Sequence, residues 1–192
     1  MSSTNQQSSG SNSGSNSGPT HVRELPILLV RLLRDPLGTV RSPLNFSWVL
    51  IVALLAGSAL VSGAVAGAII HNAIDFLIGL FIFPVTSVIS SIVFGFFIYY
   101  FFSLFQSTFL DYRRLMSLVS VSLVPYFLFH SVSSYLSPID LLGFAFTCVL
   151  LIVGLVEQFS LDRKICARLV IGLAVLFFIV WTVSQIKTSG QI

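Results

Sequence analysis

Long apolar runs alternate with short groups of charged or turn-forming residues from residue 42 onward. The first run, Trp48–Ile70, contains no charged residue and would extend about 34 Å as an α-helix, enough to cross a bilayer with some tilt. Further runs predict spans near Val85–Phe105, after the capping signal Thr108–Asp111, at Ile139–Phe159 and around Leu169–Val183. The pattern therefore predicts an all-α, polytopic membrane helical bundle with five transmembrane spans.

The region after the first run permits two interpretations. His71, Asn72 and Asp75 interrupt the apolar pattern, and Ala73–Phe83 is too short to span before Pro84 is reached. Either Ala73–Phe83 is a re-entrant or interfacial segment ahead of a single span, or two very short spans flank Pro84.

Loop charge favours the first interpretation, because cytoplasmic loops of membrane proteins are enriched in Lys and Arg. With one span, nine of the 10 basic residues lie on the N-terminal side and only Lys187 lies opposite; with two spans the division is five to five. The nine are Arg23, Arg31, Arg34, Arg41, Arg113, Arg114, Arg163, Lys164 and Arg168. We therefore expect a cytoplasmic N-terminus and an outside C-terminus. The expected location is a bacterial inner membrane, with a Golgi or ER membrane as the eukaryotic alternative.

Two segments precede the apolar runs. Residues 1–20 are rich in Ser, Asn and Gly and are expected to form a disordered tail, because they cannot bury enough apolar surface to become ordered. Residues 21–41 combine apolar positions with arginines, which predicts an amphipathic helix that either lies in the headgroup layer or forms a collar for the first span. Asp35-Pro36 should end that helix and Ser42-Pro43 should begin the next. A membrane domain is expected over residues 42–187, followed by a C-terminal tail over residues 188–192.

Composition agrees with this assignment. The chain is 55% hydrophobic and 9% charged, with a mean hydropathy of +0.96, whereas roughly a quarter of the residues in soluble domains are charged. The net charge of +3 is interpreted as loop asymmetry, and no nucleic-acid partner is expected. No secretory signal peptide is expected in the first twenty residues. Cys148 and Cys166 lack CxxC spacing and are interpreted as packing residues.

Small and polar residues indicate how the spans pack. Gly63 and Gly67 form a GxxxG motif, which lets two helix backbones approach closely, either within one bundle or in a dimer. Pro125 is expected to kink the third span. Ser117 and Ser120 belong to a stripe that continues through Val124, Phe127, Ser131 and Ser134 on one helix face. Their hydroxyls are expected to bond a neighbouring helix or the carbonyls that Pro125 frees.

Ionisable groups inside a membrane are candidate functional residues, and here they are His71, Asp75, His130 and Glu157. His71 and Asp75 are four residues apart and would share a helix face, but no third or fourth metal ligand has suitable spacing. Glu157 is expected to be neutralised by Arg163 or Lys164 across a turn. The chain lacks the HExxH, GxSxG and P-loop motifs, so neither an enzymatic activity nor a cofactor is expected.

The chain resembles the Ypt-interacting-protein (Yip) domain family, in its small bacterial-type members. The resemblance covers roughly residues 28–186 and consists of Arg34-Asp35-Pro36 before a small-residue first span, the segment TFLDYRRLMSLVSVSLVPYFLF, and closely spaced last spans joined by EQFSLDRKICARL. It implies a five-span membrane protein with a role in membrane trafficking or organisation, and it supplies no catalytic residue. The Asp-Leu-Tyr-Gly-Pro-like motif of the eukaryotic members that bind Rab-type GTPases is absent.

The leading hypothesis is a non-enzymatic membrane protein that organises lipid or partner proteins. Its expected partners are membrane lipids, anionic ones on the cytoplasmic side, and either other proteins or further copies of itself. The residues expected to make these contacts are Arg31, Arg34, Arg41, Arg113, Arg114, Arg163 and Lys164. The alternative is a small-molecule or ion transporter, or a channel, that uses the polar face of the third span together with His71, Asp75 and His130.

Overall fold

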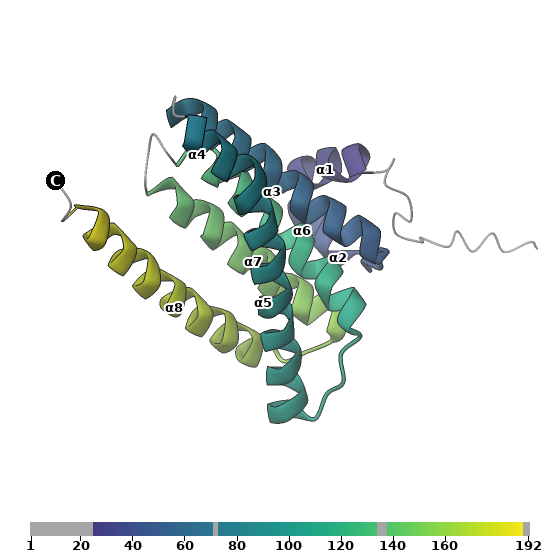
Figure 1. Cartoon of the computed structure of the whole chain (residues 1–192). Helices are drawn as coiled ribbons and strands as arrows, with labels where there is room; N and C mark the ends of the chain where they lie inside the picture. Colours follow the sequence, from purple (N-terminus) through teal and green to yellow (C-terminus); the bar gives the residue numbers. More distant parts are fainter. Residues whose placement is uncertain (1–24, 71–72, 134–137, 190–192) are drawn as a thin grey trace, which may run out of the picture.

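The computed structural model describes residues 25–70, 73–133 and 138–189, and every element within these ranges is helical (Figure 1). The elements are α1 (Leu25–Arg34), α2 (Pro36–Arg41), α3 (Trp48–Ile70), α4 (Ala73–Leu77), the π-helical turn η2 (Ile78–Ile82), α5 (Phe83–Gln106), α6 (Tyr112–His130), α7 (Ile139–Phe159) and α8 (Arg163–Ser189). The all-α prediction is confirmed for these residues. The predicted tail at residues 1–20 lies outside them, as do residues 190–192 of the tail predicted over residues 188–192, whereas residues 188 and 189 belong to α8.

Within the part of the chain that the structure describes, three segments are long and apolar enough to cross a membrane: Trp48–Ile69, Ile78–Gln106 and Ile139–Phe159. They suggest a membrane-embedded protein, and α3 and α7 have the bounds that their apolar runs predict. The arrangement with five spans stays a prediction.

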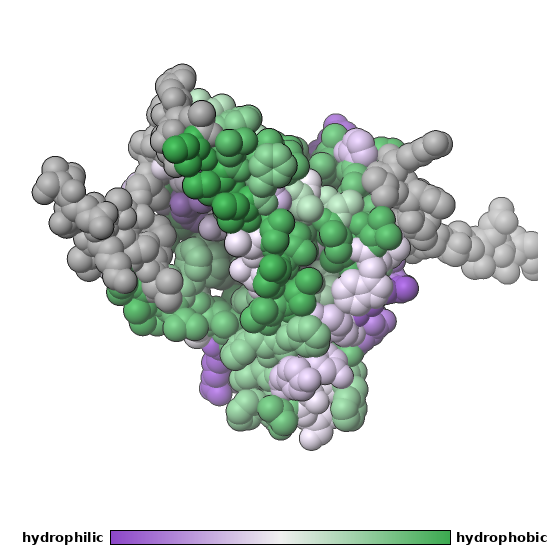
Figure 2. All heavy atoms as spheres, in the orientation of Figure 1, coloured by the Kyte–Doolittle hydropathy of each residue, from purple (hydrophilic) through white to green (hydrophobic). Residues whose placement is uncertain are grey.

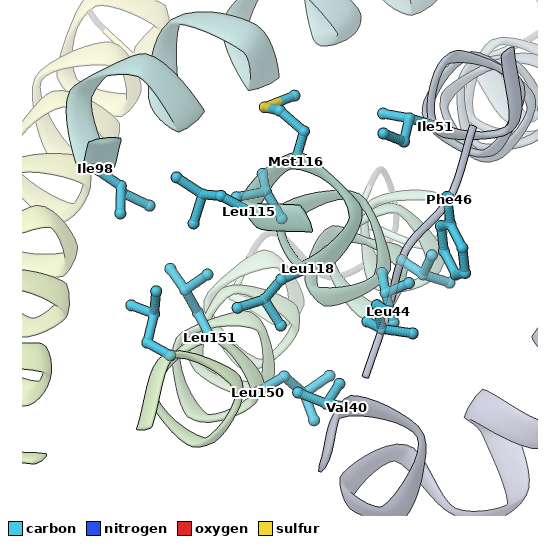
Figure 3. Close-up of a cluster of buried hydrophobic side chains, with 14 of the residues drawn as sticks. Val40, Leu44, Phe46, Ile51, Ile98, Leu115, Met116, Leu118, Leu150 and Leu151 are labelled. Carbon is cyan, nitrogen blue, oxygen red and sulfur yellow. The ribbon is translucent and has the colours of Figure 1, made fainter. Parts of the chain in front are cut away.

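Helix α6 occupies the centre of the bundle, although it carries two arginines and a series of serines. It packs most extensively against α7 and also contacts α3 and α5. Ten of its 19 residues are buried, and Figure 3 shows Leu115 and Leu118 directed toward Leu150 and Leu151 of α7. Because neighbouring helices cover it, α6 does not need the uniformly apolar surface that a lipid-facing helix requires.

Glycines on α7 bring that helix close to α6. A Cβ atom at Gly154 would lie 2.7 Å from Cγ1 of Val40 and would also collide with Leu118, so the absence of a side chain there lets α2, α6 and α7 pack closely. A Cβ atom at Gly143 would lie 2.8 Å from Cβ of Phe129. The α6–α7 contact therefore depends on two positions that are 11 residues apart and share one helix face.

Residues 73–106 form one continuous helical path, and the re-entrant or interfacial segment predicted at Ala73–Phe83 is not confirmed. The backbone stays helical through η2, where the Phe83 N–H donates to the Ile78 carbonyl, five residues back. Pro84 lacks an N–H and would clash with a carbonyl in a regular α-helix interior. The wider turn precedes Pro84 directly, and the helix continues instead of reversing or forming a separate re-entrant piece.

The N-terminal helices confirm part of the predicted juxtamembrane segment. Asp35 ends α1 and caps α2, its carboxylate accepting from the Gly38 N–H at 2.9 Å, and Pro36 occupies the first turn of α2. Ser42-Pro43 does not begin a helix, contrary to the prediction. Residues 42–47 are irregular, and Ser47 caps α3 by accepting from the Leu50 N–H at 3.3 Å.

Gly63 packs against another helix of the same chain, which is the first of the two interpretations of the GxxxG motif. Its backbone lies against Gly79 of η2, and a Cβ atom at Gly63 would be 2.8 Å from the Gly79 carbonyl carbon. Gly67 is also buried. Pro125 lies within α6, which continues to His130.

We predict that Gly63→Ala destabilises the protein, because the obstructing atoms belong to backbone and cannot rotate away. Overpacking of this kind costs about 1–3 kcal/mol. Gly57→Ala in the same helix is the matched control, since a Cβ atom there meets nothing within 4 Å. Unfolding midpoints in detergent micelles should fall for Gly63→Ala and not for Gly57→Ala. Equal midpoints for the two variants would contradict the close crossing.

Candidate functional site

The predicted basic residues gather at one end of the bundle, where three helix termini meet. The rings of Trp48, at the start of α3, and Tyr112, at the start of α6, are 5.8 Å apart. The backbone N–H of Leu44 donates to Gln158, near the end of α7, at 3.4 Å. Helix α8 begins after only three further residues, Ser160–Asp162. This arrangement brings Arg113, Arg114, Arg163 and Lys164 to the same end as Arg41.

Five of the seven predicted contact residues have exposed side chains that form neither a hydrogen bond nor an ion pair with a described residue: Arg31, Arg34, Arg41, Arg163 and Lys164. Arg113 instead donates from Nε to the Asn45 side-chain oxygen at 3.0 Å. Arg114 lies over the Phe159 ring, with Cζ 5.3 Å from the ring centroid. The five are therefore available to an anionic partner, whereas Arg113 and Arg114 hold parts of the protein together.

Buried side chains from α6 and α7 hold the irregular segment 42–47 in place. Gln158 donates to the Val40 carbonyl at 2.6 Å and accepts from the Leu44 N–H, while Ser117 accepts from the Phe46 N–H at 3.0 Å. Both side chains are almost completely buried. They satisfy backbone groups that would otherwise be desolvated without partners, so this network fixes the basic end relative to the helices. Sequence reasoning missed Gln158, because a glutamine near a span end resembles an interfacial residue.

The predicted serine face of α6 lies inside the core rather than on a pathway. Ser117 and Ser120 are completely buried, and Ser120 donates to the Ser117 carbonyl at 2.9 Å. Ser131 bonds the Phe127 carbonyl of its own helix at 3.0 Å, and Ser134 lies outside the described residues. The hydroxyls with partners thus bond backbone groups of α6 and of segment 42–47.

Three further intramembrane candidates were predicted: His71, Asp75 and Glu157. His71 lies outside the described residues, as does the side chain of Asp75. Glu157 is exposed and forms no ion pair with Arg163 or Lys164, contrary to the expectation, because α7 turns Gln158 inward and Glu157 outward. Within the ranges that the structure describes, no three His, Cys, Asp or Glu residues are grouped to hold a metal ion.

His130 has a partner that the sequence did not identify. Its Nδ1 atom lies 3.1 Å from a carboxylate oxygen of Asp140, and both side chains are largely buried. The imidazole also stacks on Phe83, with ring centroids 4.9 Å apart, and on Tyr126 at 5.7 Å. Asp140 lies ten residues further along the chain, in the first turn of α7. Pairing requires the ends of α6 and α7 to meet, which pattern alone does not reveal.

A cleft lies beside this pair, between α5, α6, α7 and α8. Its volume is about 490 Å³, within the range of small-molecule sites in proteins. Figure 2 shows a hollow between α8 and the body of the molecule, and green hydrophobic residues cover the neighbouring faces. Aromatic side chains dominate the lining, and Phe144 stacks on Phe177 with ring centroids 4.0 Å apart.

Hydroxyl groups occupy the α5 wall of the cleft. Thr86 and Ser91 bond carbonyls of their own helix, whereas the hydroxyls of Ser87 and Ser90 form no hydrogen bond with any described residue. Sequence reasoning missed this polar strip, although its signal was present. Residues 86, 87, 90 and 91 lie on one side of a helix, embedded in an otherwise apolar run.

Comparisons of the chain with family models, with curated proteins and with solved structures found no match.

We predict that Gln158→Leu weakens the basic end of the bundle. The substitution leaves the buried Val40 carbonyl and Leu44 N–H without their partner, and an unsatisfied buried group costs about 1–3 kcal/mol. Gln106→Leu, at the end of α5, is the control. Hydrogen exchange should accelerate at residues 40–46 in Gln158→Leu alone. An unchanged exchange profile would show that the network does not hold this segment.

Proposed function

We propose that the chain is a non-enzymatic, five-span membrane protein whose basic end binds anionic lipid headgroups and thereby organises membrane lipid or partner proteins. One observation carries the proposal: Arg31, Arg34, Arg41, Arg163 and Lys164 are exposed and form no ion pair with a described residue, and Arg41, Arg163 and Lys164 lie at one end of an apolar bundle. Each Lys or Arg near an anionic membrane surface contributes about 1 kcal/mol to binding.

Helix α1 supports contact between this end and lipid. Leu28 and Leu32 are buried against the core, whereas Ile27, Val30 and Leu33 are each more than 60% exposed. Arg31 and Arg34 are exposed in the same helix. A short helix that presents both apolar and cationic side chains outward suits the boundary between headgroups and acyl chains.

Contacts between helix ends support alternating crossings. The starts of α3 and α6 meet the end of α7 at the basic end, through the Trp48–Tyr112 and Leu44–Gln158 contacts. At the other end, Phe83 near the start of α5 stacks on His130 at the end of α6. If α8 also crosses, the total is five, and the positive-inside rule makes the N-terminal side cytoplasmic. The Yip-domain resemblance fits such a chain, in a bacterial inner membrane or a eukaryotic Golgi or ER membrane.

We predict that single cysteines introduced at Ser42, Gln106 and Asp162 react from one side of the membrane, and that one at Ser133 reacts from the other. The parent should carry Cys148→Ser and Cys166→Ser to remove background labelling. Maleimide labelling of right-side-out and inside-out vesicles makes the measurement. Labelling of Ser133→Cys from the same side as Asp162→Cys would exclude the five-span arrangement.

We predict that changing Arg31, Arg34, Arg41, Arg163 and Lys164 to Gln reduces enrichment of anionic lipid around the protein. At roughly 1 kcal/mol per charge, the preference for phosphatidylglycerol over phosphatidylcholine should fall at least tenfold. Native mass spectrometry of protein from mixed vesicles measures the ratio. The charge-preserving control places Lys at Arg31, Arg34 and Arg41. A ratio unchanged by the five-fold neutralisation would refute the proposal.

A further inference from the structure

We propose that the cleft between α5, α6, α7 and α8 holds an acyl chain of a bilayer glycerophospholipid, with the ester linkage of that lipid accepting hydrogen bonds from Ser87 and Ser90. The inference rests on the membrane embedding in the proposed function but not on the basic end. It assigns a lipid-binding site to a different part of the molecule.

The lining selects for hydrocarbon. No charged side chain lines the cleft, and its walls are aromatic and aliphatic, including Phe94, Phe144 and Phe177. Two of the segments that form it, Ile78–Gln106 and α7, are apolar enough to cross a membrane. A cleft in that setting opens toward acyl chains.

The unpartnered hydroxyls of Ser87 and Ser90 favour a lipid whose acyl chain is attached through a group that accepts hydrogen bonds. A hydroxyl facing hydrocarbon without a partner is costly, and the carbonyl of an ester accepts from it without introducing a charge. Ser87 and Ser90 are one turn apart on α5, so they face the same occupant. Thr86 and Ser91 line the same wall, but their hydroxyls already donate to carbonyls of their own helix and do not require an acceptor from the lipid.

Depth in the membrane fits an ester linkage. Phe83 stacks on His130, whose pair with Asp140 joins the end of α6 to the start of α7, and we take this polar pair as the level of the interface on this face of the bundle. Ser87 and Ser90 follow Phe83 by four and seven residues, which places them about 6 and 10 Å further along the helix. The interfacial layer is roughly 5–7 Å thick on each side of the hydrocarbon core, so the hydroxyls lie just beneath the headgroups.

The test uses phosphatidylcholine that carries a photoreactive diazirine on its sn-2 chain, incorporated into phosphatidylcholine vesicles with the full-length protein. Cross-linked peptides are identified by mass spectrometry. In the unaltered protein we expect labelling at Leu173–Phe177 of α8. Ser87→Ala with Ser90→Ala should reduce it, by roughly threefold for each hydrogen bond lost. Ser90→Trp places a large ring in the cleft and should reduce it further.

Matched controls make each outcome decisive. Ser103→Ala removes a hydroxyl from α5 outside the cleft, and the Arg-to-Gln variants change only the basic end; neither should alter labelling at Leu173–Phe177. Gel filtration identifies a variant that fails to fold. Labelling of exposed α3 residues with none at α8, or α8 labelling that Ser90→Trp leaves unchanged, would overturn the lipid site while leaving the embedding intact. Absence of labelling throughout the chain would instead contradict the membrane embedding itself.

Discussion

Burial of α6 between α3, α5 and α7 is the constraint on which the rest of the structure depends. This helix begins with two arginines and carries several serines, so a lipid-facing position would leave many of its polar groups without partners. Its neighbours cover it closely because Gly143 and Gly154 of α7 have no side chains to hold the helices apart. The least apolar of the long central helices is thus also the most enclosed.

Enclosure of α6 determines what happens at its two ends. At the arginine end, Ser117 reaches the backbone of segment 42–47, and Gln158 from α7 completes the support of that segment. At the opposite end, α6 delivers His130 to Asp140 and Phe83. The rigid part of the molecule therefore separates a cationic end from a cleft on the other half of the bundle. Binding of lipid at the two places would involve different chemistry, one electrostatic and one apolar.

The sequence predicted those features that depend on local pattern. Helices α3 and α7 have their predicted bounds because each coincides with one long apolar run. The path through Pro84 could not be predicted, since it depends on a wide turn that packs against α3. The cleft was also missed, because it is produced by the position of α8 relative to α5. The role of the α6 serines was misjudged for the same reason: periodicity shows which residues share a face but not which neighbour covers it.

The wide turn at Ile78–Ile82 also sets the rotational phase of everything that follows it in α5. A π-helical turn accommodates one residue more than the α-helix around it, and each residue advances an α-helix by about 100°. Without that additional residue, the hydroxyl strip at 86–91 would rotate away from α8 toward another neighbour. The orientation of the polar wall of the cleft therefore depends on the one additional residue in the turn at Ile78–Ile82. Deleting that residue would rotate the wall without altering any side chain that forms it.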